Sequence, residues 1–189
     1  MEITVVAVVG MCGSGKSEIT RMFAQKGYHR IHFGEITMRE IQSRGLSINE
    51  SNEKQVREEL RKKYGLAAYA RLALPDIEKA KTMGPVVLDG LYSWSEFKLL
   101  KEKYRDSLII LAVVANKAVR QCRLARRDYR ALAADEVDAR DYAEIENLEK
   151  GGPIANADYF ITNNASFASL ETQFDDFLKW IGSQTQKDQ

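Results

Sequence analysis

Apolar residues gather in short runs along the chain, each of a length typical of a single buried strand. Between these runs, apolar residues recur at spacings of three and four, which is typical of amphipathic helices. Strands and helices that alternate in this way predict an α/β fold, with a parallel sheet covered by helices on both faces. The predicted strands are 3–9, a short one within 27–34, 86–90, 107–115 and 157–162.

The predicted helices differ in how much apolar surface they offer. Residues 18–26 and 170–181 each have a broad apolar face, which is suited to covering a sheet. Residues 49–64 have only a narrow stripe, in which Val56, Leu60 and Tyr64 recur at four-residue steps. Such a helix covers a sheet poorly. We therefore expect it to belong to a small helical arm that stands over the crevice at the carboxyl ends of the strands.

Helix-breaking residues predict where the elements end. Pro75 lies inside a helical pattern and predicts a kink. The segment Gly151-Gly152-Pro153 predicts a break in the chain, and the residues from Gly182 onward predict a polar, frayed tail. We therefore expect one domain over residues 1–182, followed by a polar tail at 183–189.

The composition is that of an ordinary soluble chain, with 189 residues, 44% apolar and 29% charged, and a net charge of +1. A net charge near zero creates no global field that would attract nucleic acid or an anionic membrane. The first apolar run is too short to span a bilayer and has no basic lead. Cys12 and Cys122 lie far apart and lack metal-ligand spacing, which suggests a reducing compartment. We expect a cytoplasmic protein whose partner is a small molecule, with no nucleic acid and no membrane.

The segment Gly10–Ser17, GMCGSGKS, is a complete G-x-x-x-x-G-K-S phosphate-binding motif between the first predicted strand and helix. Its glycines allow successive N–H groups to turn inward around a phosphate chain, and the following helix N-terminus favours an anion. Lys16 can then reach the terminal phosphates of a nucleoside triphosphate, and the Ser17 hydroxyl can hold magnesium. The residues expected to bind the nucleotide in this loop are Gly10, Cys12, Gly13, Ser14, Gly15, Lys16 and Ser17.

Four candidate site residues, within this motif or later in the chain, each allow two interpretations. Cys12 is either an ordinary variable position of the loop or a reactive thiol. Glu35 follows the second strand, where it is either a general base or outer magnesium ligand at the crevice, or a cap of the next helix. Arg71 is either an anion ligand or a cation that reaches water. Asp89 ends the third strand, where a carboxylate can hold magnesium, although Asp-Gly also makes turns; we favour the magnesium role.

Charge is strongly segregated late in the chain. Five arginines, Arg120, Arg123, Arg126, Arg127 and Arg130, precede a stretch of acidic residues between 135 and 149. An acidic helix that folds back would pair with some of them as a solvated hairpin. We favour the alternative, in which Arg123, Arg126 or Arg127 contacts phosphate from a lid that is mobile until the nucleotide binds.

The order of these parts resembles the small-molecule P-loop kinases. The phosphate loop, Gly34-Glu35, the helical arm, Leu88-Asp89-Gly90 and the arginine-rich segment follow one another as in nucleoside monophosphate kinases. The stretch 157–164 is similar to the last strand of dephospho-CoA kinases. In its length and in the order of its elements, the whole chain resembles an uncharacterised, largely archaeal family described as adenylate-kinase-related or dephospho-CoA-kinase-like.

The resemblance implies a P-loop NTPase fold with five strands in the order 2-3-1-4-5, an acceptor arm near 36–72 and a lid near 120–145. It also implies ATP and Mg²⁺ as cofactors. The chain departs from nucleoside monophosphate kinases at two arginines. Those kinases carry one arginine shortly after the Asp-Gly of the third strand, where this chain has Leu91-Tyr92-Ser93. They carry another four residues after the glycine that ends the second strand, whereas Arg39 falls five residues after Gly34. We expect Arg39 and Arg71 to bind the acceptor instead.

The sequence thus predicts an ATP-dependent phosphotransferase that acts on a nucleotide-like small molecule. Lys16, Arg126 and Arg127 are the expected ligands of the transferring group. A phosphate acceptor requires no base because it is already mostly ionised near neutral pH. A hydroxyl acceptor, as in the dephospho-CoA kinases, requires one, and Glu35 is the candidate. The alternative from another class is a nucleotide-dependent switch or slow NTPase that signals to a partner.

Overall fold

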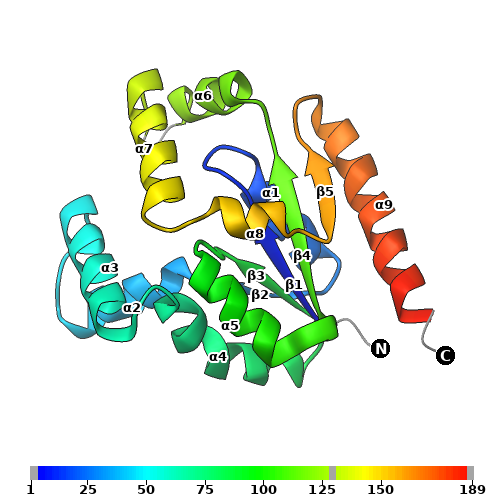
Figure 1. The fold of residues 1–189 in the computed structure, drawn as a ribbon, viewed down its shortest axis with the longest axis horizontal. Helices are drawn as coiled ribbons and strands as arrows, with labels where there is room; N and C mark the ends of the chain where they lie inside the picture. The colour runs from blue at the N-terminus through cyan, green and yellow to red at the C-terminus, as the bar shows by residue number, and fades with distance from the viewer. Residues whose placement is uncertain (1–3, 128–130, 187–189) are drawn as a thin grey trace.

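The protein is described from a computed structural model, which covers residues 4–127 and 131–186. Its strands form one parallel sheet in the order β2-β3-β1-β4-β5, which confirms the predicted fold class and strand order (Figure 1). The strands are β1 Val5–Val9, β2 His29–His32, β3 Val86–Asp89, β4 Leu108–Val114 and β5 Tyr159–Thr162.

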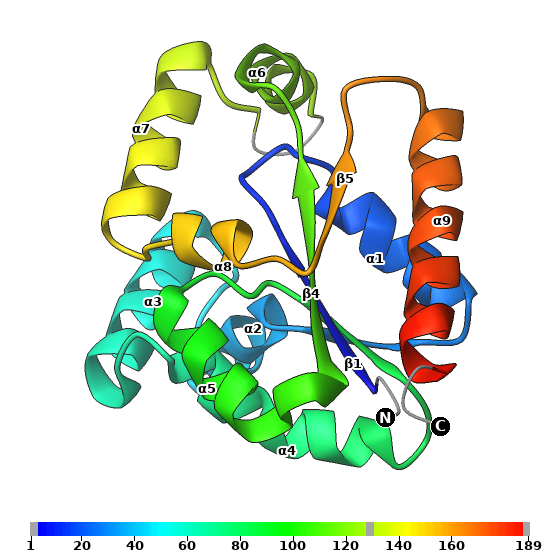
Figure 2. The same cartoon turned by 45° about the vertical axis from the view of Figure 1, so that its right-hand side comes forward.

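Helices lie on both sides of this sheet and beyond the carboxyl ends of its strands (Figures 1 and 2). They are α1 Lys16–Gln25, α2 Gly34–Ser43, α3 Glu50–Tyr64, α4 Ala68–Lys81, α5 Trp94–Tyr104, α6 Lys117–Ala125, α7 Ala134–Glu146, α8 Gly151–Ala155 and α9 Phe167–Gln186, with a 3₁₀ turn, η1, at Arg105–Ser107. No helix in the described part of the chain is both long and apolar enough to cross a membrane.

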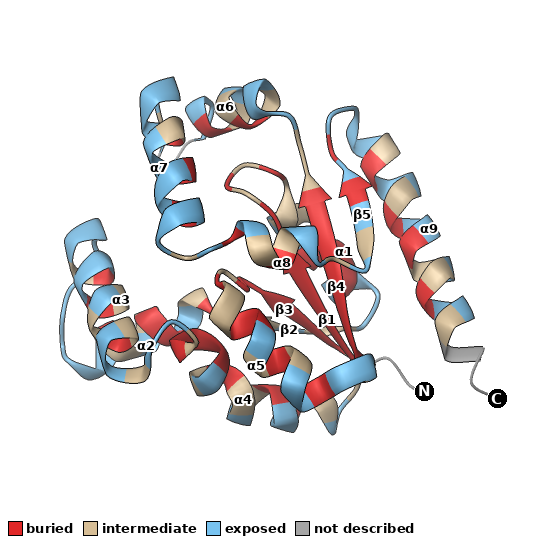
Figure 3. Ribbon diagram, viewed as in Figure 1, coloured by how far each residue is buried: buried red, intermediate tan, exposed pale blue. Residues whose placement is uncertain are grey.

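Alternation along the strands divides the core into two layers. Val6 and Val8 of β1 face α1 and α9, where Phe23, Phe174 and Phe177 pack edge to face. The other residues of β1 face α4 and α5. The three central strands, β1, β3 and β4, are almost entirely buried because helices cover both faces of the sheet, whereas the edge strands β2 and β5 are partly exposed (Figure 3).

Helices α2 and α3, here called the arm, lie to one side of the carboxyl end of β3, whereas α4 packs on the sheet (Figure 1). Helix α3 begins where the Asn49 side chain accepts a hydrogen bond from the Asn52 N–H at 2.9 Å, and it ends at Gly65, whose φ is 79°. Val56 and Leu60 are buried against the core, whereas most of the helix is exposed. The narrow apolar stripe seen in the sequence therefore forms the base of this arm.

One expectation about element ends is wrong, and two helices extend past residues at which a kink or a tail is predicted. Gly151-Gly152-Pro153 forms the short helix α8 rather than a break, because Pro153 falls in its first turn, where a missing N–H costs no intrahelical bond. Helix α4 runs unbroken past Pro75. Helix α9 continues to Gln186, past the predicted start of the tail, with the Ser183 hydroxyl bonded to the Trp180 carbonyl.

Candidate nucleotide-binding site

The phosphate loop, Gly10–Ser17, connects β1 to α1 and contains positions that only glycine can fill. Gly10 and Gly15 have φ values of 148° and 102°. A Cβ atom on Gly10 would lie 2.2 Å from the Val113 carbonyl oxygen, and one on Gly15 would lie 2.1 Å from Nδ2 of Asn163. No side chain caps α1, so the first N–H groups of this helix are available to an anion. The loop is therefore shaped as the motif predicts.

Lys16 bridges the two ends of this loop, because its Nζ donates a hydrogen bond to the Met11 carbonyl at 2.9 Å. Desolvation by the surrounding protein and, second, the nearby ammonium of Lys150 lower the pKa of Lys16 to about 7. Ser17 is exposed in the first turn of α1. The Ser14 hydroxyl is buried and has no hydrogen-bond partner among the described residues.

Asn163, at the end of β5, links the loop to Arg123. Its Nδ2 donates to the Ser14 carbonyl at 2.9 Å, and its Oδ1 accepts from Nη2 of Arg123 at 3.1 Å. Nη1 of Arg123 is buried without a partner in the described chain. Of the three arginines expected to contact phosphate, Arg123 thus lies beside the loop. Its two companions, Arg126 and Arg127, are exposed at the end of α6, and Arg130 lies outside the described residues.

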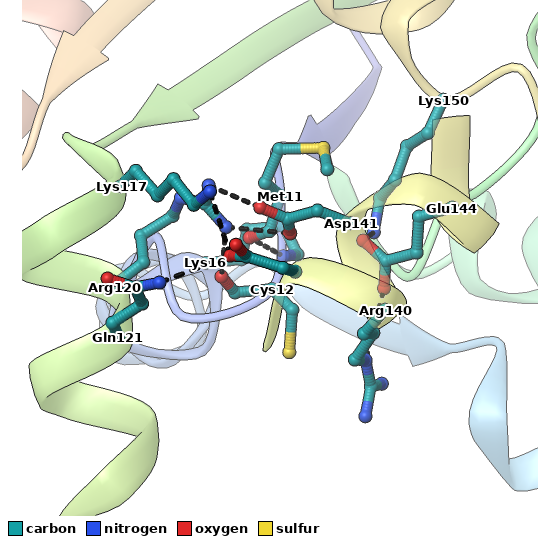
Figure 4. Close-up of polar contacts among 11 residues, drawn as sticks. Met11, Cys12, Lys16, Lys117, Arg120, Gln121, Arg140, Asp141, Glu144 and Lys150 are labelled. Carbon is teal, nitrogen blue, oxygen red and sulfur yellow. Dashed lines mark hydrogen bonds and ion pairs between the residues drawn. The ribbon is translucent and has the colours of Figure 1, made fainter. Parts of the chain in front are cut away.

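Helices α6 and α7, here called the lid, pack directly on the phosphate loop (Figure 4). The buried guanidinium of Arg120 donates to both carboxylate oxygens of Asp141, at 2.8 and 2.6 Å, and to the Cys12 carbonyl at 3.2 Å. The Cys12 side chain is buried in a small apolar cluster with Leu124 and Val137. The acidic stretch therefore folds back onto the arginine-rich helix, and the lid is anchored to the loop.

The turn between α7 and α8 carries a second buried lysine, Lys150, which no sequence pattern indicated. Lys150 is only 1% exposed, and its Nζ donates to Oε2 of Glu144 at 2.7 Å. The other oxygen of Glu144 accepts a hydrogen bond from Arg140 at 3.4 Å. Burial would raise the pKa of Glu144, but Lys150, Arg140 and Lys16 together hold it below its usual value. Because lysine is seldom buried, a lysine in a polar stretch of sequence is expected at the surface, and no local pattern distinguishes Lys150 from the others.

Asp89 ends β3 beside β1, as expected, but Arg30 of β2 holds its carboxylate. Oδ2 of Asp89 accepts hydrogen bonds from Arg30, including one from Nε at 3.0 Å, and from the Thr20 hydroxyl at 3.3 Å. The residues that the structure describes contain no cluster of three or more His, Cys, Asp or Glu side chains arranged for a metal. A hydroxyl at Ser17 and one carboxylate fit magnesium that keeps water and phosphate oxygens as its other ligands.

Comparison of the sequence with known proteins places the chain in a family. The family model described as an AAA domain matches residues 6–147. A UPF0200 protein of Thermococcus sibiricus is 31% identical over 182 residues, which is 94% of this chain and 95% of that protein. The chain belongs to the UPF0200 family.

Solved kinases share the fold of this UPF0200 chain. A shikimate kinase from Bacteroides thetaiotaomicron superposes with a TM-score of 0.62 at 13% identity, over 95% of this chain and 98% of its own. A dephospho-CoA kinase from Campylobacter jejuni gives 0.54 at 15% identity, over 94% and 97%. This likeness shows a P-loop kinase-like fold.

The residues expected to contact the acceptor lie away from the phosphate loop. Glu35 is exposed in the first turn of α2 and lines a surface pocket of about 340 Å³ along β2, together with Arg30 and Arg39. Arg39 donates to Asp76 of α4 at 2.7 Å, and Arg71 is exposed on α4. In the described structure, no hydrogen bond or ion pair joins Glu35, Arg39 or Arg71 to the loop. Glu35 follows β2, as its place in the sequence indicates, but in the first turn of α2 its side chain is exposed.

Two further charged side chains, on α3 and α5, each have a buried polar atom without a partner in the described chain. The Arg61 guanidinium lies over the Tyr69 ring, 5.2 Å from its centroid, and its Nε is buried without a partner within the described ranges. The buried Glu96 caps α5 by accepting hydrogen bonds from the N–H groups of Tyr92 and Ser93. Burial raises the pKa of Glu96 to about 7, although these two bonds and the charge of Arg61 oppose the shift.

Proposed function

We propose that this chain is an ATP- and magnesium-dependent phosphotransferase that acts on a nucleotide-like small molecule. The enclosure of the phosphate loop carries the proposal. The lid is anchored on the loop through Arg120 and Cys12, and the arm borders the end of β3. Phosphoryl transfer requires that water be kept from the γ-phosphate, and a covered loop with a second helical element beside it meets that requirement.

In this proposal the loop does most of the binding. Lys16 and the loop N–H groups hold the β- and γ-phosphates, and Ser17 and Asp89 hold magnesium. Magnesium, when bound, neutralises charge on the transferring group. Arg123 already lies beside the loop, and Arg126 and Arg127, exposed at the end of α6, would turn toward the bound phosphates and supply further positive charge. The protein therefore positions and neutralises rather than forming a covalent intermediate.

The acceptor would enter between the arm and the loop. The Nε of Arg61, on the arm, is buried without a partner among the described residues, so Arg61 joins Arg39 and Arg71 as a proposed ligand of an anionic acceptor. A phosphate acceptor would need no base. A hydroxyl acceptor would need Glu35 to turn toward the site, in which case Glu35→Gln lowers the transfer rate by about two to four orders of magnitude.

The proposal is tested by a screen for turnover. Purified protein is mixed with magnesium and ATP in the presence of nucleotides, nucleosides and coenzyme precursors, and phosphorylated products are separated from free phosphate. We expect transfer to at least one acceptor, and we expect Lys16→Ala to abolish it without changing the far-ultraviolet circular dichroism. Free phosphate alone, with no acceptor phosphorylated, would instead favour a slow NTPase or switch.

A further inference from the structure

Lys150 is placed by a backbone that would not otherwise turn a lysine inward. Glu149, just before it, has a φ of 53°, a left-handed conformation that is costly for a residue other than glycine. Glu149 is exposed and Lys150 is buried, so this single residue reverses the direction of the side chains. Non-glycine residues held in this region often occur at functional sites, where surrounding contacts maintain them.

Contacts with α5 maintain this turn. The Trp94 N–H donates to the Leu148 carbonyl at 3.2 Å, and a Cβ atom on Gly152 would lie only 2.7 Å from the Trp94 ring. Trp94 stacks in turn on Phe97, with ring centroids 4.7 Å apart. The residues on both sides of Lys150 are therefore held against the start of α5. The ammonium has a defined position rather than the freedom of a surface lysine.

The charges around this ammonium do not balance. Lys150, Arg140 and Lys16 surround Glu144, so three basic side chains share one carboxylate. The nearby Asp141 is already bonded twice by Arg120. Clustered positive charge in a partly desolvated site is unfavourable unless an anion joins it. The lowered pKa of Lys16, for which Lys150 is the second cause after desolvation, reflects the same imbalance.

The position of Lys150 also matches a gap in the sequence. Its Nζ lies over the Tyr92 ring, 5.1 Å from the centroid, and Tyr92 belongs to the segment where the chain lacks the arginine found in nucleoside monophosphate kinases. Lys150 also contributes to the electrostatic environment of Glu96, on the arm side of the loop. From the turn between α7 and α8, Lys150 therefore lies near the segment that replaces the missing arginine.

We propose that Lys150 is a second lysine ligand of the γ-phosphate, opposite Lys16, and that Glu144 is the counterion that it exchanges for phosphate oxygen. This inference rests on the proposed function, because it assumes that a nucleoside triphosphate binds at Gly10–Ser17. Lys150 would meet the transferring phosphate on the side that faces the acceptor. Figure 4 shows its side chain directed from the end of α7 toward Glu144 and the loop.

The test compares nucleotides with and without a γ-phosphate. Titration calorimetry measures the binding of magnesium with adenylyl imidodiphosphate, a non-hydrolysable ATP analogue, and of magnesium with ADP. Lys150→Met keeps the apolar stem and removes the charge. We expect this variant to lose about tenfold or more in affinity for the analogue, the value of one charge-assisted bond, while its affinity for ADP changes much less.

Two further variants separate binding from folding. Lys150→Met removes the main partner of the buried Glu144 carboxylate and can destabilise the fold. The double variant Lys150→Met, Glu144→Gln removes both charges of the pair, so it should be more stable than the single variant. It should show the same selective loss for the analogue. Lys179→Met removes a surface lysine that pairs with Asp176 at 2.8 Å on α9, and it should bind both nucleotides as the wild type does.

A measurement on the wild-type protein keeps the proposal testable if both variants fail to fold. With ¹⁵N at the lysine side chains, the analogue should shift the Lys150 ammonium resonance strongly and ADP should shift it weakly, with Lys150→Arg identifying the signal. Equal responses to the two nucleotides, or none at Lys150, would overturn the assignment. If the wild type binds neither nucleotide, the proposed function itself fails. Binding without selectivity at Lys150 refutes this inference alone.

Discussion

Arg120 and Asp141 form a buried ion pair with two hydrogen bonds, and the same guanidinium donates to the Cys12 carbonyl of the phosphate loop. Because Arg120 is on α6 and Asp141 is on α7, one side chain joins both lid helices to the loop. Lid position and loop conformation are thus coupled through Arg120.

Asp141→Asn should therefore loosen the lid. The substitution leaves the Arg120 charge buried without its main partner, which costs about 3 kcal/mol or more of unfolding free energy. Amide hydrogen exchange should rise across α7 and stay unchanged in β1 and β4. Bound nucleotide should restore part of the protection, since phosphate can replace the lost anion near the loop.

Asp138→Asn is the matched control for this lid prediction. Asp138 is on the same helix, one turn earlier, and pairs with Lys117 at 2.8 Å where both side chains are partly exposed. Such a pair contributes about 1 kcal/mol or less. Equal exchange in the two variants would show that Arg120 and Asp141 do not anchor the lid.

The parts of the fold that could be predicted depend on local signals. Each central strand is a run of apolar residues because both faces of the sheet are buried there, and the glycines of the phosphate loop are required by their own backbone angles. The acidic stretch and the arginine-rich helix are neighbours along the chain, so the sequence left their pairing open as the less favoured alternative, and the structure forms it. These features need no knowledge of distant contacts.

The missed parts depend on tertiary packing. Lys150 is buried only because α8 lies against α5, and Arg30 holds Asp89 only because β2 and β3 are neighbours in the sheet. Arg39 lies one residue away from the spacing of the kinase arginine, and its side chain bonds to Asp76 of α4. Residue spacing places a side chain on an element. It does not tell which neighbour that side chain will meet.

Arg30 and Asp89 should have opposite effects on magnesium. Asp89→Asn removes the carboxylate proposed to hold the ion, so the magnesium concentration needed for binding of the ATP analogue should rise by about tenfold. Arg30→Met removes a competing cation from the same carboxylate and should lower that concentration. Calorimetric titrations with the analogue at several magnesium concentrations measure both effects. Shifts of the same sign would refute a magnesium role for Asp89.

Glu96 should make stability depend on pH. Burial raises its pKa to about 7 in the folded protein, whereas an unfolded glutamate titrates near 4.5. Between these values the folded state binds more protons than the unfolded state, so the free energy of unfolding falls as pH rises. The stabilisation is complete below about pH 4.5 and is lost as pH passes through about 7, with a total change of about 3 kcal/mol.

Glu96→Gln should remove this pH dependence, because an amide oxygen can accept the same bonds from Tyr92 and Ser93 without ionising. Its NH₂ group would replace Oε1, which is buried and has no partner in the described part of the chain. Urea unfolding at pH 5, 6, 7 and 8 measures the slope. Glu102→Gln, on the exposed face of the same helix, should keep the wild-type slope. If Glu96→Gln also keeps it, another group titrates in this range and Glu96 remains ionised in its cap.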